Sequence, residues 1–322
     1  MKTAKIGLLG FGNVGGGTYK ILTENKKLIE DRTGVSPEVV KILQRNRNKK
    51  RFVDADPSLL TENPEDIISN PNVDIVVEML GGIEPATSFM VDAMKNGKHV
   101  ISANKAAVAA NYELLTSVAK ENNVELLFEA SVAGGIPVLT SMTGALQANN
   151  FVEVMGILNG TTNYILTKMT DEGLAYADVL KDAQEKGFAE ADPTADVEGI
   201  DAANKLSILI ALAFGKYVAP DAIPTVGISG VTADDIKAAA DQGKKIKLIG
   251  QAFIKDDKLE YCVKPLLLDA SHPLAGVSNE FNAVYITGDM VGELMFYGRG
   301  AGPLPTGSAV CGDIVTLMKT RF

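Results

Sequence analysis

Residues 4–15 read AKIGLLGFGNVG, an apolar run that passes directly into a glycine-rich turn. The run is typical of a buried strand, and a helical pattern begins near residue 14. The turn matches GxGxxG: the first glycine permits a tight turn, the second close approach to a pyrophosphate, and the third close packing of helix on strand. We therefore expect a dinucleotide on the helix N-terminus, with an ordinary glycine-rich turn as the alternative. The cofactor-binding residues of this turn would be Gly10, Phe11, Gly12, Asn13, Val14 and Gly15.

Apolar strands and amphipathic helices alternate over about the first 130 residues. Strand patterns lie near residues 4–9, 39–44, 74–78, 99–102 and 124–128, and helical patterns near 14–30, 85–96 and 111–122. Continuous Val, Ile and Leu strands alternating with helices indicate a parallel sheet covered on both faces. The expected fold class is α/β, with a Rossmann-type NAD(P)-binding domain at 1–130 that the C-terminal helix, about 301–322, rejoins.

The pattern changes between residues 131 and 300. Helical patterns lie near 138–147, 161–171, 175–186 and 197–214, and strand patterns near 151–158, 246–254, 259–267, 281–287 and 291–297. The later strands alternate apolar and polar residues, which is typical of an antiparallel sheet. We expect an α+β domain that binds substrate and forms the interface of a homodimer.

Composition excludes several classes of protein. The 322 residues exceed the usual size of a single core, and the net charge of −9 argues against binding to nucleic acid or to an anionic membrane. No apolar run reaches the ~18–20 residues that a membrane span requires. The N-terminus leads directly into a strand, and Cys262 and Cys311 lie far apart, so we expect no signal peptide and two free thiols in a reducing cytoplasm. With only His99 and His272, neither a zinc site nor a Ser-His-Asp triad is expected.

The second strand ends in a basic segment where many NAD-binding proteins carry an acid. Residues 44–51 read QRNRNKKR. Basic side chains at this position, with Arg45 and Arg47 first among them, suit the 2′-phosphate of NADP. A solvated basic loop is the alternative, and NAD remains compatible with the sequence.

The segment Ser102-Ala103-Asn104-Lys105 follows a predicted strand. Its position is the carboxyl edge of the sheet, where open α/β sheets bind their ligands. Lys105 can there meet both the nicotinamide end of a cofactor and a polar substrate. A solvated surface lysine is the alternative.

A cluster of acids precedes an almost wholly apolar helix. Residues 190–214 read EADPTADVEGIDAANKLSILIALAF. In a helix over about 197–214, Asp201 and Lys205 stand one turn apart on one face, and the apolar C-terminal half predicts burial. We expect the pair at the mouth of a dry groove. An exposed ion pair, which contributes only a few tenths of a kcal/mol, is the alternative.

Six motifs occur in order along essentially the whole chain: GFGNVG (10–15), SANK (102–105), EASVAGGIPVL (129–139), GILNGTTNYILTKM (156–169), the acidic run (187–205) and GRGAGPLPTG (298–307). Together they closely resemble the homoserine dehydrogenase family. The resemblance implies reversible NAD(P)-dependent interconversion of L-aspartate 4-semialdehyde and L-homoserine, in threonine, methionine and isoleucine biosynthesis. Many members continue into a regulatory ACT domain, which these residues lack, so the resemblance does not carry threonine feedback through such a domain over to this chain.

The resemblance also implies roles for the charged residues. Lys205 would be the general acid/base, and Lys105 would hold substrate or cofactor and share in proton transfer. Glu190 and Asp201 would contact the amino acid, and Asp196 would support the polar cluster. The chemistry is consistent, because carboxylates can hold the homoserine ammonium while a positioned amine exchanges the hydroxyl proton.

Two further sites follow from the resemblance. Ser102 and Gly302 would contact the cofactor, the latter from a loop that covers the nicotinamide; a loop that simply leads into a helix is the alternative. A sodium ion would be held by Glu129 and by backbone carbonyls, although the residues alone describe only a glycine-rich connector. The carbonyl ligands would be those of Val132, Gly134 and Ile136.

Two other functions remain open at this point. Aspartate-semialdehyde dehydrogenase works through a cysteine thioester, but Cys262 lies in a strand pattern and Cys311 in a helix pattern, neither suited to a nucleophile. A cofactor-sensing regulatory protein would bind NAD(P) without turnover. The presence of both lysines and the acids in one chain argues against it.

Overall fold

The computed structural model describes residues 1–45 and 51–322, and the chain divides into two compact units. The first unit contains Met1–Gly135 and Ala301–Phe322, and the second contains Ile136–Gly300. Arg47, together with Lys49 and Lys50 of the basic segment, lies outside the described residues.

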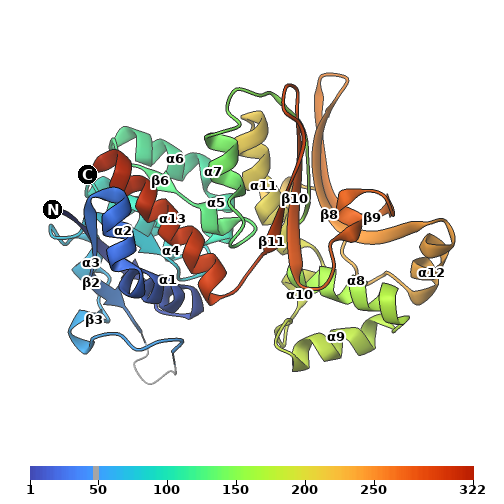
Figure 1. Cartoon of the computed structure of the whole chain (residues 1–322), viewed down its shortest axis with the longest axis horizontal. Coiled ribbons are helices and arrows are strands. Elements are labelled where there is room, and N and C mark those ends of the chain that lie inside the picture. Colours follow the sequence, from blue (N-terminus) through green and yellow to red (C-terminus); the bar gives the residue numbers. More distant parts are fainter. Residues whose placement is uncertain (46–50) are drawn as a thin grey trace. The chain divides into compact units, whose positions relative to one another are not determined.

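The first unit is built on a six-stranded parallel sheet with the order β3-β2-β1-β4-β5-β6 (Figure 1). Its strands are β1 (Lys2–Leu9), β2 (Val35–Leu43), β3 (Leu60–Thr61), β4 (Ile75–Glu78), β5 (His99–Ser102) and β6 (Leu126–Leu127). The order reverses at β1 and β4, which in doubly wound sheets opens a ligand crevice at the carboxyl ends of those strands. This confirms the predicted α/β class and its Rossmann-type domain.

Helices cover both faces of this sheet. Ile75 and Val77 of β4 pack on the face covered by α1 (Asn13–Glu24), α2 (Lys26–Thr33) and α13 (Pro303–Arg321). The intervening Val76 packs on the face covered by α3 (Glu65–Ile68), α4 (Ala86–Lys95) and α6 (Tyr112–Glu121). Successive strand residues point to opposite faces, and burial on both sides explains the three successive apolar residues 75–77. Within the described residues, no helix is long and apolar enough to cross a membrane.

The C-terminal helix α13 packs directly on α1, as Figure 1 shows. A Cβ at Gly17 would lie 1.9 Å from the carbonyl oxygen of Pro303, and a Cβ at Gly307 would lie 2.7 Å from the amide nitrogen of Thr18. The two backbones therefore touch, and no larger residue fits at either glycine. This contact fixes the first turn of α13 beside the helix that follows the glycine-rich turn.

The second unit contains a five-stranded antiparallel sheet with the order β11-β10-β7-β8-β9 (Figure 1). Its strands are β7 (Phe151–Ile157), β8 (Lys244–Lys255), β9 (Lys258–Asp269), β10 (Phe281–Gly288) and β11 (Gly292–Arg299). The helices of this unit are α7 (Val138–Thr143), α8 (Gly160–Glu172), α9 (Tyr176–Glu185), α10 (Thr194–Val197), α11 (Ile200–Phe214) and α12 (Ala233–Asp241). Because α11 contacts β7, β8 and β9, its apolar sequence is explained by burial against the sheet.

Several elements differ from the sequence-based expectation. The helix predicted over 14–30 is divided at Asn25 into α1 and α2, and the helix predicted to reach residue 147 ends at Thr143. The helix predicted from residue 197 begins only at Ile200, because Gly199 adopts a left-handed φ of +81°. Strand β3 and helix α12 were not predicted.

Candidate active site

The glycine-rich turn joins β1 to α1 at the carboxyl edge of the parallel sheet. Gly10 has φ +112°, and a Cβ on Gly15 would lie 2.3 Å from the carbonyl oxygen of Gly10, so packing requires both glycines. By contrast, no atom of the described residues lies within 4 Å of a Cβ position on Gly12. Gly12 therefore leaves open space in front of the first N–H groups of α1, which is the arrangement that an approaching pyrophosphate needs.

A cavity of about 390 Å³ extends from this turn to the end of β2. Gln44, Arg45 and Arg51 line it together with Gly10 and Gly12. Nη1 of Arg51 donates a hydrogen bond to the carbonyl oxygen of Phe11 at 3.0 Å, which holds this guanidinium beside the glycine turn. Two arginines in one cavity provide the planar donors that bind phosphate groups.

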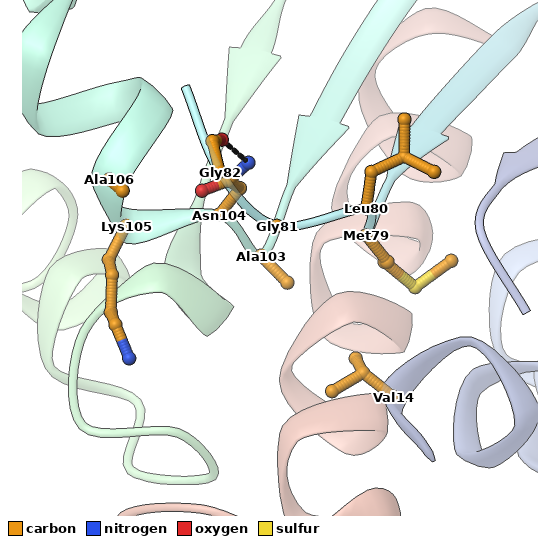
Figure 2. Close-up of a pocket in the computed structure, with 9 residues that line it drawn as sticks. All are labelled: Val14, Met79, Leu80, Gly81, Gly82, Ala103, Asn104, Lys105 and Ala106. Carbon is orange, nitrogen blue, oxygen red and sulfur yellow. Dashed lines mark hydrogen bonds between the residues drawn. The ribbon is translucent and has the colours of Figure 1, made fainter. Parts of the chain in front are cut away.

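A second cavity, of about 370 Å³, lies at the carboxyl ends of β4 and β5 (Figure 2). Its walls are residues 79–82, residues 103–106 and Val14. Lys105, the first residue of α5 (Lys105–Ala110), lines this cavity on the side opposite Val14 and Met79, as Figure 2 shows. Lys105 is therefore placed beside a ligand-sized space in the cofactor-binding unit.

Glu78 was not singled out in the sequence, yet it connects the walls of this second cavity. Its fully buried carboxylate accepts hydrogen bonds from Ser102 Oγ at 2.7 Å and from the Leu80 amide at 2.7 Å. Ser102 is itself fully buried and bonds Glu78 instead of lining the cavity. The available signal was an acid that ends the apolar run IVVE at the carboxyl edge of the sheet.

Helix α11 of the second unit buries a lysine and a carboxylate together. The side chains of Lys205 and Asp201 are only 9% and 4% exposed. Nζ of Lys205 donates to Asp201 Oδ2 at 2.7 Å and to the Leu158 carbonyl at 2.5 Å. The exposed ion pair considered as an alternative is therefore excluded, and the pair is a buried charged group held by hydrogen bonds.

Asn159 and Thr161 extend this cluster from the start of α8. Asn159 Nδ2 donates to Asp201 Oδ2 at 2.9 Å and to Asp196 Oδ1 at 2.7 Å. Oδ1 of the same side chain accepts from the Thr162 amide and caps α8. Thr161 Oγ1 donates to Asp196 Oδ2 at 3.2 Å. Asp196, Asp201 and Lys205 are thus brought together as one hydrogen-bonded group.

Glu190 lies outside this buried group. It belongs to the segment between α9 and α10 and is exposed. Its carbonyl oxygen accepts a hydrogen bond from Gln184 Nε2 at 3.1 Å, which anchors the backbone of the segment. The structure therefore places the expected substrate contact on an exposed segment of the second unit.

The expected sodium ligands begin at a buried glutamate. The amide of Glu129 donates to Asp313 Oδ2 on α13 at 2.9 Å. The chain then bends through Ala133 and Gly134, with φ values of +55° and +57°. One carboxylate with backbone carbonyls is a set of oxygen donors, the ligand type that hard cations prefer. Of the expected carbonyl ligands, Val132 and Gly134 belong to the first unit and Ile136 to the second.

Neither cysteine suits nucleophilic catalysis. Burial raises the pKa of Cys311 to about 12 and also raises the pKa of Cys262. The nucleophile is the thiolate, and a raised pKa disfavours it at neutral pH. A mechanism through a cysteine thioester is therefore poorly supported by these sites.

The parallel-sheet crevice, the open glycine turn and the buried lysine–carboxylate group together define a class of protein, the NAD(P)-dependent oxidoreductases. Comparisons with known proteins make the assignment specific. The family model "Homoserine dehydrogenase, NAD binding domain" matches residues 10–129, and the model "Homoserine dehydrogenase" matches residues 137–315. The chain belongs to the homoserine dehydrogenase family, whose members act in amino-acid biosynthesis.

Three relatives agree with this assignment. Homoserine dehydrogenase of Bacillus subtilis is 46% identical over 99% of this chain and 74% of its own length. The homoserine dehydrogenase structure from Thiobacillus denitrificans has a TM-score of 0.96 at 44% identity, covering 99% of this chain and 74% of that one. A hyperthermophilic archaeal homoserine dehydrogenase in complex with NADPH has a TM-score of 0.80 at 26% identity, covering 99% and 98%.

Proposed function

We propose that Lys205 is the general acid/base in the interconversion of L-homoserine and L-aspartate 4-semialdehyde, and that NADP is the preferred cofactor. The observation that carries the first part is the burial of Lys205 between the carboxylate of Asp201 and the carbonyl of Leu158. A lysine is retained in such a place only when its ammonium is paired and hydrogen-bonded. A fixed amine next to carboxylates suits an amino-acid alcohol.

Lys205 would transfer a proton in both directions of the reaction. In reduction, the ammonium of Lys205 gives a proton to the developing alkoxide; in oxidation, the neutral amine removes the proton of the hydroxyl group. Bound NAD(P) supplies or accepts the hydride. Asp201 and Leu158 fix the direction of the Lys205 amine, because each accepts one of its hydrogen bonds.

Carboxylates of the second unit would bind the substrate ammonium. Asp196 and Asp201 are both held by Asn159, so their oxygens form a preorganised acidic group. Glu190 would join them from its exposed segment. In this proposal Asp196 supports the cluster, and Glu190 and Asp201 contact the amino acid.

In the first unit, the glycine turn would hold the pyrophosphate and the arginine-lined cavity would hold the adenosine end. Arg45 and Arg51 lie in that cavity and suit a 2′-phosphate. An archaeal relative has been solved in complex with NADPH, which supports an NAD(P) site in this unit. Lys105 would meet the nicotinamide end or the substrate. Gly302 would lie near the cofactor, because α13 begins against α1.

A sodium ion, a dimer and a cytoplasmic location complete the proposal. The ion would use the carboxylate of Glu129 and carbonyls of the loop that follows. The dimer would form on the antiparallel sheet, because Met295 and Tyr297 of its edge strand β11 are 42% and 53% exposed. Tyr297 also stacks on Phe281 with ring centroids 5.2 Å apart, which makes this exposed area more extensively apolar. The cytoplasmic location is proposed because both cysteines are free thiols, as in a reducing compartment.

One experiment tests the substrate, the cofactor and the ion together. Homoserine oxidation is followed by nicotinamide absorbance with NAD and with NADP in parallel, each with sodium and with potassium as the only alkali ion. We expect turnover with a higher kcat/KM for NADP and stimulation by sodium. A higher kcat/KM for NAD would contradict the proposed preference, and equal rates in the two salts would contradict the ion.

A further inference from the structure

Glu78 is a fully buried carboxylate at the carboxyl end of β4, where it pairs in register with Ser102 of β5. Its hydrogen-bond donors include Ser102 Oγ, the Leu80 amide and Asn104 Nδ2, at 2.7, 2.7 and 3.4 Å from its oxygens, and the Gly81 amide. Removing a carboxylate from water is costly unless hydrogen bonds replace the lost hydration. A carboxylate without a function at this position would therefore only reduce the stability of the fold.

The directions of these hydrogen bonds favour the ionised form of Glu78. The Leu80 amide can only donate, and Ser102 Oγ accepts from the Asn104 amide at 3.0 Å, which leaves its hydrogen for Glu78. The side-chain Oδ1 of Asn104 accepts from the Ala107 amide, so its Nδ2 group faces Glu78. Burial raises the pKa of Glu78, whereas these hydrogen bonds and one from the Gly81 amide lower it.

The same network joins the two walls of the cavity at the ends of β4 and β5. On one wall, Leu80 bonds Glu78, and Gly82 accepts from Asn104 Nδ2 at 2.7 Å, the contact drawn in Figure 2. Gly81 and Gly82 have φ values of +83° and +74°, so this wall is a glycine loop whose shape depends on its anchors. On the other wall, Asn104 caps α5 immediately before Lys105.

We infer that Glu78 is a positioning residue: its carboxylate fixes the loop 79–82 and, through Asn104, the place of Lys105, so that the cavity keeps the shape required by the nicotinamide half of the cofactor. The inference rests on the proposed function, which assigns this cavity and Lys105 to cofactor and substrate. It adds a residue that touches neither and acts through its hydrogen-bond partners.

The test uses Glu78→Gln, which keeps the shape of the side chain but replaces one acceptor oxygen with a donor. We expect the Kd for NADPH, measured by fluorescence titration, to rise at least tenfold and kcat at saturating cofactor to fall at least tenfold. The KM for homoserine should stay within threefold of the wild type. Glu78→Asp keeps the charge but is one methylene shorter, and we expect it to restore less than half of the lost affinity.

Asp74→Asn is the matched control. Asp74 directly precedes the same strand, at its opposite end, and its carboxylate also accepts a backbone hydrogen bond, from the Lys5 amide at 2.8 Å. This variant should lower the Tm and leave the Kd for NADPH unchanged. If Glu78→Gln likewise lowers only the Tm, the positioning role is wrong. Should Glu78→Gln fail to fold, Ser102→Ala retains the acid, removes one donor, and should raise the Kd for NADPH in the same direction to a smaller extent.

A double-mutant cycle separates this inference from the proposed function. If Glu78 acts through Asn104, the effects of Glu78→Gln and Asn104→Ala on the Kd for NADPH are not additive; additive effects would overturn the inference. The double-mutant cycle is measured through the Kd for NADPH and requires no turnover. Full activity in Lys205→Ala would refute the proposed acid/base and leave the cycle interpretable.

Discussion

Asp201 and Lys205 stand one turn apart on α11, and the carboxylate of the first accepts a hydrogen bond from the amine of the second across 2.7 Å. Both side chains are buried, and Asn159 donates to the same carboxylate oxygen. The acid is thus shared between an amine and an amide that belong to different elements of the unit. A change at Asp201 should consequently affect the position of Lys205 as well as the binding of substrate.

Replacing Lys205 with alanine should lower kcat at least a hundredfold in both reaction directions, because the proton then has to exchange with solvent. Circular dichroism should show an intact fold. Lys168→Ala, at a partly exposed lysine of α8 paired with Glu172, is the control and should keep wild-type kcat. Partial recovery of Lys205→Ala by added alkylamines would support a proton-transfer role, whereas near-normal turnover without them would exclude it.

Asp201→Asn should raise the KM for homoserine about tenfold and also lower kcat, because an amide carries no charge to hold either ammonium group. Steady-state kinetics at saturating cofactor measure both effects. Asp192, which bonds Thr194 on the exposed segment, provides the comparison: Asp192→Asn should change both constants less than twofold. An unchanged KM in Asp201→Asn would remove the substrate contact from this residue.

Arg51→Ala should raise the KM for NADP about tenfold while changing the KM for NAD less than twofold, since the lost charge–phosphate interaction exists only for the 2′-phosphate. Lys41→Ala removes a cation from β2 that bonds the Ser58 carbonyl and does not line the cavity, and it should leave both values unchanged. An equal rise in the KM for NAD and for NADP would mean that Arg51 binds a group that both cofactors carry.

Gly12, which precedes α1, and Gly17, which lies within α1, should respond differently to replacement by alanine. Gly17→Ala should lower the free energy of unfolding by about 3 kcal/mol, because its Cβ would lie 1.9 Å from the Pro303 carbonyl oxygen. In Gly12→Ala the new Cβ would meet no atom of the described part of the chain within 4 Å, so we expect stability within about 0.5 kcal/mol of wild type but at least tenfold weaker NADPH binding. Urea unfolding and fluorescence titration distinguish the two; tight NADPH binding by Gly12→Ala would contradict the proposed pyrophosphate position.

Lys247 of β8 predicts a pH dependence of stability. Its buried amine donates to the Val277 carbonyl and to Asn163, and burial lowers its pKa to about 8, with nearby Lys245 lowering it further and Asp171 opposing. The unfolded chain then binds more protons than the folded one between pH ~8 and ~10.4, so stability should rise with pH in that window, by up to about 3 kcal/mol.

Lys247→Met lacks the titrating group and should lose this rise, as measured by urea unfolding at several pH values. Lys255→Met, at the exposed end of the same strand, should retain it. If the two variants show the same slope between pH ~8 and ~10, then Lys247 does not titrate in that range.

Much of the fold was predictable because it depends on local periodicity. The strands β4 and β5 carry the buried apolar residues 75–77 and 100–101, as expected of strands covered on both faces, and the helix over residues 200–214 shows the apolar surface that its burial requires. Two-residue β3 is too short to show a period. Helix α12 was overlooked although its capping box, Thr232 with Asp235, is present in the sequence.

The candidate site, like the fold, could be predicted from the sequence only in part. The spacing of Asp201 and Lys205 follows from helix geometry, so their pairing could be predicted. The contact of Asn159 with Asp196 joins residues 37 positions apart, and that of Glu129 with Asp313 joins residues 184 apart; no periodicity connects them. Glu78 was missed for the same reason, since its partners are defined by the register between two parallel strands.

By itself, the sequence determined the glycine turn, the alternation of strands and helices, and the lysine–carboxylate spacing, because each is a property of neighbouring residues and of the period of one element. Only the tertiary structure decided which charges are buried, which glycines are fixed by a crossing backbone, and which acid holds the cavity walls. Those outcomes depend on strand register and helix packing between distant segments, where the free energy of burial and the available hydrogen-bond donors are set by the whole unit.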